Sequence, residues 1–143
     1  MNTYLKLKQK HQEEVNSFPM AFAFNQKQFE EGMKKLGLKP TDTDKIYGLH
    51  GTGGFFRKTD ENKLNEMFDR HKEEMKNAVE SDKTGEGFIY DMFNYELANH
   101  EYVVTYSVDD TLRALGLTAE EVNNNPALLH GLQKARKTQF DNQ

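Results

Sequence analysis

The hydrophobic pattern of this 143-residue chain changes its period near residue 18. Before that point, apolar or ring-bearing residues recur every three or four positions from Tyr4 to Phe18, which predicts an amphipathic helix over residues 3–16. After it, large side chains alternate with small ones over Met20–Phe24, which is the period-two pattern of a strand. The small face of that strand consists of alanines and would let another element approach closely.

One phrase occurs twice along the chain: a strand-like segment, a capping residue, a helical pattern and the tripeptide Leu-Gly-Leu. The first copy spans residues 22–38 and the second spans residues 103–117. In each copy the glycine, Gly37 or Gly116, has an apolar residue four positions before it and a leucine directly after it. These positions are typical of a Schellman ending with a left-handed glycine, so the sequence predicts where both helices stop.

The region between the two copies predicts further elements of both kinds. Residues 45–49 and 55–57 flank a glycine-rich turn and predict a hairpin. Two helical patterns with apolar faces follow the hairpin. Asn25 and Ser107 are expected to cap the helices of the first and second copies.

The predicted fold is a helix-rich α+β single domain with one small sheet and two strand–helix–Leu-Gly-Leu modules. The strands Met20–Phe24 and Tyr102–Tyr106 are expected to pair in this sheet, so that the modules form pseudo-equivalent halves. Residues 1–143 fit one domain by length. Its polar tail, residues 138–143, is expected to fray.

Composition and charge remove several classes of function. The chain has no cysteine, which excludes disulfides, thiolate nucleophiles and cysteine-based zinc sites. Its net charge of −4 disfavours broad nucleic-acid binding, which normally goes with a basic balance. No apolar stretch approaches the roughly 20 residues of a membrane span, and the N-terminus does not resemble a signal peptide. We therefore expect a soluble, cytoplasmic protein with no cofactor and no membrane partner.

The glycine-rich turn at residues 50–54 is the first candidate for chemistry, because successive backbone N–H groups can form an anion-binding nest. Its spacing is not that of a P-loop or a dinucleotide-binding motif, and no serine-nucleophile motif accompanies it. Glycines near a strand end most often form a tight turn, so a structural turn, a ligand loop and, more remotely, a catalytic loop stay open. The candidate ligand-binding residues are His50, Gly51, Gly53, Gly54 and Arg57.

The histidines give a second candidate set. His11, His71 and His100 fall on the apolar stripes of predicted helices, and Glu96 lies one turn before His100. A buried polar pair of Glu96 and His100, a metal-ligand pair and plain surface placement are the alternatives. A metal site needs three or four convergent ligands and only these two are adjacent, so no metal is expected.

Other chemistry-bearing residues have structural explanations. The acidic pairs at residues 109–110 and 120–121 lie in predicted first helical turns, where the helix dipole favours acids. A run of aromatic residues could line a pocket or a partner surface, although core packing is the favoured account. This run comprises Phe88, Tyr90, Phe93, Tyr95, Tyr102 and Tyr106. We propose no catalytic residue.

Four stretches of the chain carry a resemblance. They are Phe22-Ala-Phe-Asn25, Phe29-Glu-Glu-Gly32, the glycine turn with Phe55-Phe-Arg-Lys58, and Tyr95-Glu-Leu-Ala-Asn-His-Glu-Tyr102. With these, the chain resembles small uncharacterised proteins of phages and integrative elements of Gram-positive bacteria, over most of its length. The resemblance implies a cytosolic accessory product of a mobile element and transfers no catalytic residue.

Two functional hypotheses follow. The first is a non-enzymatic interaction module whose partner is a host or phage protein, or a second copy of the chain. The alternative is a small-molecule or phosphate-type anion-binding protein that uses the 50–54 turn.

Overall fold

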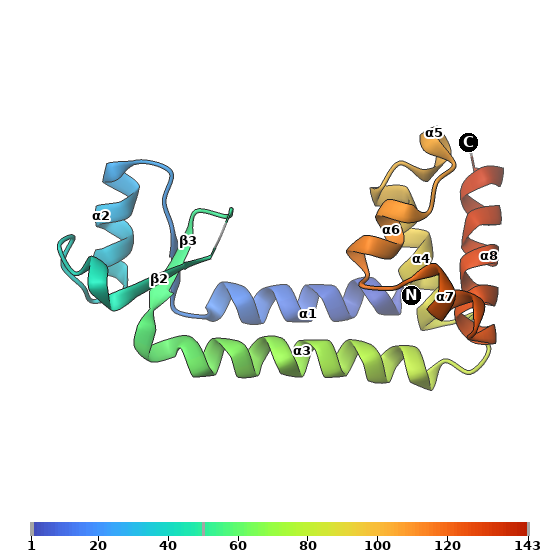
Figure 1. The fold of residues 1–143 in the computed structure, drawn as a ribbon, viewed down its shortest axis with the longest axis horizontal. Coiled ribbons are helices and arrows are strands. Elements are labelled where there is room, and N and C mark those ends of the chain that lie inside the picture. The colour runs from blue at the N-terminus through green and yellow to red at the C-terminus, as the bar shows by residue number, and fades with distance from the viewer. Residues whose placement is uncertain (1, 50, 143) are drawn as a thin grey trace. The chain divides into compact units, whose positions relative to one another are not determined.

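The computed structural model describes residues 2–49 and 51–142 of the chain (Figure 1). Helices dominate, and three short strands form one sheet, so the predicted helix-rich α+β class is confirmed. In chain order the elements are α1 (Thr3–Ser17), β1 (Met20–Phe22), α2 (Gln26–Lys35), η1 (Thr43–Lys45), β2 (Ile46–Leu49), β3 (Gly54–Arg57), η2 (Lys58–Asp60), α3 (Glu61–Ser81), α4 (Phe88–Asn99), α5 (Tyr102–Thr105), α6 (Asp109–Ala114), α7 (Ala119–Asn123) and α8 (Pro126–Asp141). Here η denotes a short 3-10 helix.

The chain forms two compact units, each with its own apolar interior. We call Met1–Lys10 with Glu73–Gln143 the helical unit, and His11–Lys72 the sheet unit. Helices α1 and α3 contribute residues to both units. That the whole chain is one domain stays a prediction.

In the sheet unit, β3 is the central strand of an antiparallel sheet with the order β1-β3-β2. The predicted hairpin is confirmed, because β2 pairs with β3 in a register that places Leu49 opposite Gly54. The other edge of β3 pairs with β1, where Ala21 lies opposite Phe55. The first predicted strand therefore forms, over Met20–Phe22 rather than as far as Phe24.

Each face of this sheet has its own small apolar cluster. Helix α2 covers one face, on which Ala21 and Phe55 pack with Met33 and Leu36. On the other face, Met20 and Phe56 pack with residues of α3. The close approach expected over the alanine face occurs at Gly32 of α2: a Cβ atom there would lie 2.6 Å from Phe55 Cζ and 2.8 Å from Ala21 Cβ.

In the helical unit, the core gathers around α4 and α8, which lie side by side (Figure 1). This core is formed by the apolar sides of helices and not by the faces of a sheet. The buried residues are Tyr4, Ile89, Met92, Phe93, Leu97, Tyr102, Leu112, Val122, Leu128, Leu132 and Ala135.

The predicted strand Tyr102–Tyr106 is wrong, because residues 102–105 form the short helix α5. Its predicted pairing with the first strand and the pseudo-equivalence of the two modules are therefore wrong as well. The backbone N–H groups of Val104 and Thr105 bond to the carbonyl of Glu101, and that of Tyr106 bonds to the carbonyl of Tyr102. The strands described in the structure all pair within the sheet unit, so this segment satisfies its backbone locally instead.

Both helix endings form as predicted. Gly37 and Gly116 have φ values of 75° and 69°. The Leu38 N–H bonds to the Met33 carbonyl at 2.8 Å, and the Leu117 N–H bonds to the carbonyl five residues before it at 2.9 Å. These are the six-residue bonds of the Schellman motif.

The two expected N-caps differ. Asn25 caps α2, since its side-chain oxygen accepts the Gln28 N–H at 2.8 Å. Ser107 lies one residue too early, because the cap position of α6 is Val108. At the C-terminus, α8 continues to Asp141, so most of the tail that we expected to fray is helical. Whether it frays in solution stays a prediction.

No helix formed by residues 2–49 and 51–142 is both long and apolar enough to cross a membrane.

Candidate functional site

The glycine turn joins β2 to β3, and several of its polar groups bond to nearby residues: the Thr52 N–H donates to the Leu49 carbonyl, and the Gly53 carbonyl accepts the Ala23 N–H. Gly51 and Gly53 have φ values of 78° and 73°, which glycine adopts without strain. Thr52 Oγ1 donates to the Leu49 carbonyl at 2.9 Å and accepts the Gly54 N–H at 3.0 Å. His50, the remaining candidate in this turn, lies outside the described residues.

Two of these glycines also make room for exposed phenylalanines. A Cβ atom at Gly53 would lie 2.8 Å from the Phe24 ring, and one at Gly54 would lie 2.9 Å from the Phe22 ring. The two rings are 80% and 53% exposed. The absence of a side chain at the two glycines therefore leaves room for these exposed aromatic residues.

Arg57, the predicted cation of the turn, is engaged elsewhere. Its Nε and Nη2 atoms each lie 2.8 Å from Asp60 Oδ2, and its Nη1 donates to the Leu36 carbonyl at 3.4 Å. Asp60 is buried, so this ion pair is partly shielded from solvent. The structure thus places Arg57 against a carboxylate, and the anion site at the turn stays a prediction.

Glu96 and His100, the second candidate pair, lie next to each other in the helical unit. His100 Nε2 is 3.4 Å from Glu96 Oε2, and the Glu96 side chain is buried. Two residues of α1 complete the cluster: the Tyr4 hydroxyl donates to Glu96 Oε1 at 3.1 Å, and Lys8 Nζ lies 3.2 Å from the same oxygen.

In this cluster, the buried carboxylate of Glu96 is surrounded by a hydroxyl donor and by the positive charge of Lys8. Burial and the Glu96 charge together raise the pKa of Tyr4, so its hydroxyl stays a donor. Lys8 Nζ also lies 5.6 Å and 5.3 Å from the ring centres of Tyr4 and Tyr95. The sequence pairing of Glu96 with His100 did not reveal Tyr4 or Lys8; their spacing of four on one helix face was the available signal. Among the residues that the structure describes, no group of three or more His, Cys, Asp or Glu side chains could hold a metal ion.

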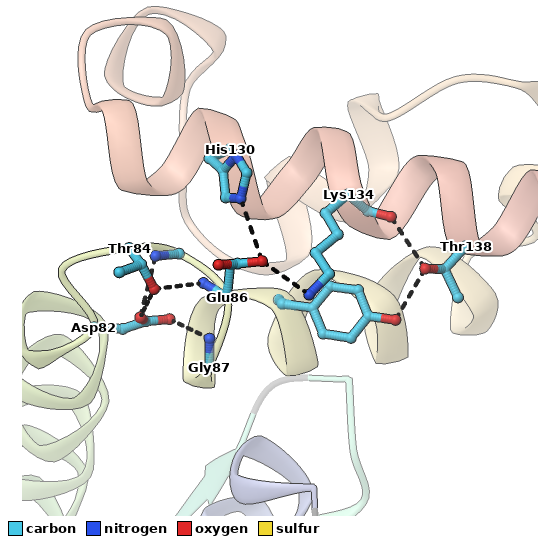
Figure 2. Close-up of polar contacts among 9 residues, drawn as sticks. Asp82, Thr84, Glu86, Gly87, His130, Lys134 and Thr138 are labelled. Carbon is cyan, nitrogen blue, oxygen red and sulfur yellow. Dashed lines mark hydrogen bonds and ion pairs between the residues drawn. The ribbon is translucent and has the colours of Figure 1, made fainter.

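A third polar cluster lies in the loop between α3 and α4 (Figure 2). Asp82 Oδ2 accepts the N–H groups of Gly87 and Ile89, each at 3.0 Å, and its Oδ1 accepts the Gly85 N–H at 3.1 Å. Burial opposes ionisation of Asp82, but these backbone donors outweigh it and lower the pKa of the carboxyl. The oxygen-bearing residues at alternate positions resemble the start of a calcium loop, yet the position of the closing bidentate glutamate is the buried Phe93. The carboxylate of Asp82 instead accepts hydrogen bonds from backbone N–H groups of the same loop.

The same loop is tied to α8 through Glu86 (Figure 2). Its Oε1 atom lies 3.2 Å from Lys134 Nζ and 3.8 Å from His130 Nε2. The Lys134 hydrogen bond and charge, with a smaller effect of His130, lower the pKa of Glu86. Lys134 Nζ also lies 4.7 Å from the Tyr90 ring centre, and the Tyr90 hydroxyl lies 2.9 Å from Thr138 Oγ1. These groups hold one another in place.

A surface groove on α5 and α8 combines aromatic rings with cations. Its volume is about 240 Å³, and its lining residues are Tyr102, Gln133, Arg136, Lys137 and Phe140. Arg136 Nε donates to the Tyr102 hydroxyl at 2.9 Å, and the guanidinium carbon lies 5.7 Å from the centre of that ring. The guanidinium is therefore held at the groove by a ring and a hydrogen bond.

Exposed apolar side chains occur on α5, directly after it and on α8. Val104 is 70% exposed, Tyr106 53% and Phe140 59%. The Tyr106 ring centre lies 6.1 Å from that of Tyr102 and 6.4 Å from that of Phe140, so the three rings adjoin. We define the α5–α8 surface as Tyr102, Val104, Tyr106, Arg136, Lys137 and Phe140.

Sequence reasoning assigned residues 102–106 to a strand and therefore missed this surface. The aromatic run was the signal that could have found it, because a partner surface was one of the three explanations given for that run. The structure divides that run: Phe93 and Tyr102 are buried in the core, whereas Tyr106 is exposed.

Comparison with known proteins identifies a family. The chain matches the model of a family of unknown function, DUF7659, over residues 3–138. This protein belongs to that family. No curated protein and no solved structure matches the chain.

Proposed function

We propose that this member of the family is a non-enzymatic protein that acts by binding another protein through the α5–α8 surface. The observation that carries the proposal is the exposure of Tyr106 and Phe140, whose rings adjoin at a groove that also contains cations, together with the exposure of Val104 on α5. Grouped apolar side chains on a soluble surface, rimmed by polar groups, mark interaction sites more often than single exposed residues do. Aromatic residues and arginine are also enriched in the centres of protein interfaces.

The polar clusters support a non-enzymatic role. Glu96, Asp82 and Arg57 each have their charges or lone pairs occupied by neighbouring groups of the protein. A general base or nucleophile needs a reactive atom within reach of a substrate. The charged groups of these three residues contact other groups of the protein instead. The clusters thus explain how loops and helices are fixed, and leave the α5–α8 surface as the best candidate for recognition.

We place this activity in the cytoplasm, as an accessory function of a phage or mobile element, with a host or phage protein as partner. This part of the proposal rests on the sequence resemblance and the absence of cysteine. A second copy of the chain is the other candidate partner.

Affinity capture with the full chain tests the proposal. The wild type and the single variants Val104→Asp and Phe140→Asp would be used as bait in a lysate of a bacterium that carries the gene, after circular dichroism has shown that both variants fold. We expect a reproducible captured protein that both variants lose. Phe24→Asp is the matched control, since it also replaces an exposed apolar side chain, outside the α5–α8 surface. Identical capture by all four proteins would contradict the proposal.

Self-association is tested separately by sedimentation of the purified chain. If the partner is a second copy, the wild type sediments as a dimer and Phe140→Asp as a monomer. The anion-binding alternative has less support, because Arg57 pairs with Asp60 and the Gly54 N–H is bonded within the turn. A thermal-shift screen with nucleotides and phosphorylated metabolites tests it: a ligand at 100 times its Kd stabilises by about 2.7 kcal/mol.

A further inference from the structure

We infer that the α5–α8 groove receives an acidic side chain of the partner protein, flanked in the partner by an apolar residue. This inference rests on the proposed function and adds the chemistry of the partner. It is carried by the charge of the lining residues, by the geometry of Arg136 and by the rings beside the groove.

The charge of the groove is opposite to that of the protein as a whole. Among the described residues, those that line it include Arg136 and Lys137 and no aspartate or glutamate, although Asp141 pairs with Lys137. The chain overall has a net charge of −4. A cationic groove on an acidic protein favours an acidic group by complementarity and disfavours cationic partners.

Arg136 is arranged to bind a carboxylate. Its Nε atom is committed to the Tyr102 hydroxyl, which together with the ring contact fixes the plane of the guanidinium. The guanidinium also carries Nη1 and Nη2, and an arginine can donate two parallel hydrogen bonds to a carboxylate. The Tyr102 hydroxyl oxygen accepts from Nε, so its own proton is available to the same carboxylate.

Lys137 adds a second charge that can change partner. Its Nζ atom lies 3.3 Å from Asp141 Oδ2, one turn later on α8, and both side chains are largely exposed. Exposed pairs of this kind contribute little stability, so exchange of Asp141 for an acidic group of the partner costs little.

The size of the groove and the rings beside it favour a side chain of a protein over a free ligand. At about 240 Å³, the groove is smaller than the pockets that enclose small molecules, which are roughly 300–1,000 Å³. Phe140 and Tyr106 extend an apolar surface directly next to it. An apolar residue beside the acidic one would pack there, as an anchor at the centre of the interface.

A single-stranded nucleic acid also combines anionic groups with flat rings, so it is the competing class of partner. The acidic balance of the chain argues against it, because a polyphosphate would be repelled along most of its length. We therefore assign a protein segment to the groove.

Peptide binding to the full-length protein tests the inference. A short fluorescent peptide of alternating glutamate and phenylalanine is compared with two matched peptides, one with glutamine for glutamate and one with alanine for phenylalanine. We expect the first peptide to bind at least tenfold more tightly than either. Equal binding of the glutamate and glutamine peptides would overturn the inference.

Variants locate the binding. Arg136→Gln should weaken the glutamate–phenylalanine peptide about tenfold or more, and Arg136→Lys should restore only part of the affinity, since lysine lacks the planar fork. Lys137→Gln is the second variant, because its exposed side chain can be replaced without disturbing Tyr102. The control is Lys63→Gln, an exposed lysine of α3 outside the groove. Unchanged affinity in both the Arg136→Gln and Lys137→Gln proteins would contradict the inference.

Two further arms separate this inference from its alternatives. A single-stranded oligonucleotide that displaces the peptide, and whose binding also depends on Arg136, would overturn the assignment to a protein segment. If Phe140→Asp abolishes capture of a partner while the peptides do not discriminate by charge, the interaction function stands and the inference about its chemistry fails. If Phe140→Asp leaves capture unchanged and the peptides also do not discriminate by charge, both the proposed function and the inference are wrong.

Discussion

The two copies of the repeated phrase end alike and begin differently. In residues 22–38, an extended segment precedes helix α2, and Asn25 caps it with a hydrogen bond to its third residue. In residues 103–117, a helical turn precedes α6, and the position of the cap is Val108, whose side chain makes no capping bond. Yet Gly37 and Gly116 adopt the same left-handed conformation and close the same six-residue hydrogen bond.

The difference shows which structural features depend on neighbouring residues alone and which depend on residues far away in the sequence. A Schellman ending is closed by bonds among six successive residues, so its sequence suffices to form it. A strand needs the edge of another strand for its backbone groups. The hairpin supplies that edge to β1 in the sheet unit, whereas residues 102–105 pack with the helices α4 and α8.

The largest effect should come from Tyr102, because it is the residue through which α5 enters the core of the helical unit. Of the four residues of α5, only Tyr102 is buried, and Val104 is 70% exposed. Truncating a buried large aromatic residue costs about 3–5 kcal/mol, so Tyr102→Ala should lower the free energy of unfolding by that amount. Val104→Ala, the matched control, should change it by less than about 0.5 kcal/mol. Urea unfolding measures both, and equal losses would contradict the helical assignment.

The shared helix endings should be equally sensitive in both copies. Gly37→Val and Gly116→Val should each cost about 1–2 kcal/mol, because a side chain with a Cβ is strained in the left-handed conformation. Within the part of the chain that the structure describes, no atom outside the glycine and its two chain neighbours lies within 4 Å of a Cβ placed at Gly37 or Gly116, so the expected loss comes from backbone strain and not from a steric clash. Thermal or urea unfolding of the two variants should give similar losses. A difference larger than their combined error would show that the endings are not equivalent.

Removal of the polar side chain before α2 should lower the free energy of unfolding more than removal of the one before α6. Asn25→Ala should cost about 1 kcal/mol, since it removes the cap of α2. Ser107→Ala should cost only a few tenths of a kcal/mol, because Ser107 Oγ accepts a single N–H, that of Asp109 at 3.2 Å, outside the cap position. The two values come from the same unfolding measurement, and a larger loss for Ser107→Ala would overturn the comparison.

The smallest effect concerns the pH dependence of stability and comes from a pair of histidines in the sheet unit. In the sheet unit the rings of His11 and His71 stack at 3.9 Å with an angle of 14°. Their surroundings include Glu14 on α1, and Arg70 and Phe68 on α3. His71 Nε2 is buried without a hydrogen bond, although Glu14 Oε1 lies 3.4 Å away. Burial, and then the charge of His11, lower the pKa of His71 despite the opposing effect of Glu14.

A lowered folded pKa fixes the sign of the pH effect. The neutral form of His71 is favoured in the folded state, so its contribution is fully present above its unfolded pKa of about 6.5 and is lost as pH falls through the folded value. The hydrogen bond from Arg70 lowers the pKa of Glu14 to about 2, so Glu14 stays ionised throughout. From about pH 7.5 to about pH 5, the wild type should therefore lose more thermal stability than His71→Gln. A pH dependence of stability in His71→Gln equal to that of the wild type would contradict the prediction.

Much of the fold could be predicted from local patterns. The hairpin, the helix boundaries to within a few residues, the Asn25 cap and the two endings all depend on residues close together in sequence. The site could be predicted only in part: the pairing of Glu96 with His100 follows from one helical turn, but Tyr4 and Lys8 reach Glu96 from 92 and 88 positions away. The spacing of four places Tyr4 and Lys8 on one helix face, but a single sequence does not show which distant residue that face contacts.

The sequence by itself determined the α+β class, the two helix endings and the absence of thiol chemistry, because each depends on composition or on bonds within one turn. Only the tertiary structure decided that Tyr102–Thr105 is helical, that Arg57 pairs with Asp60 and that Arg136 meets Tyr102 beside Phe140. Valine and tyrosine favour strands, yet a strand is stable only where another edge can bond to it. That edge is supplied by residues distant in the sequence. The same strand-like pattern therefore forms a strand in the sheet unit and a helix, α5, in the helical unit.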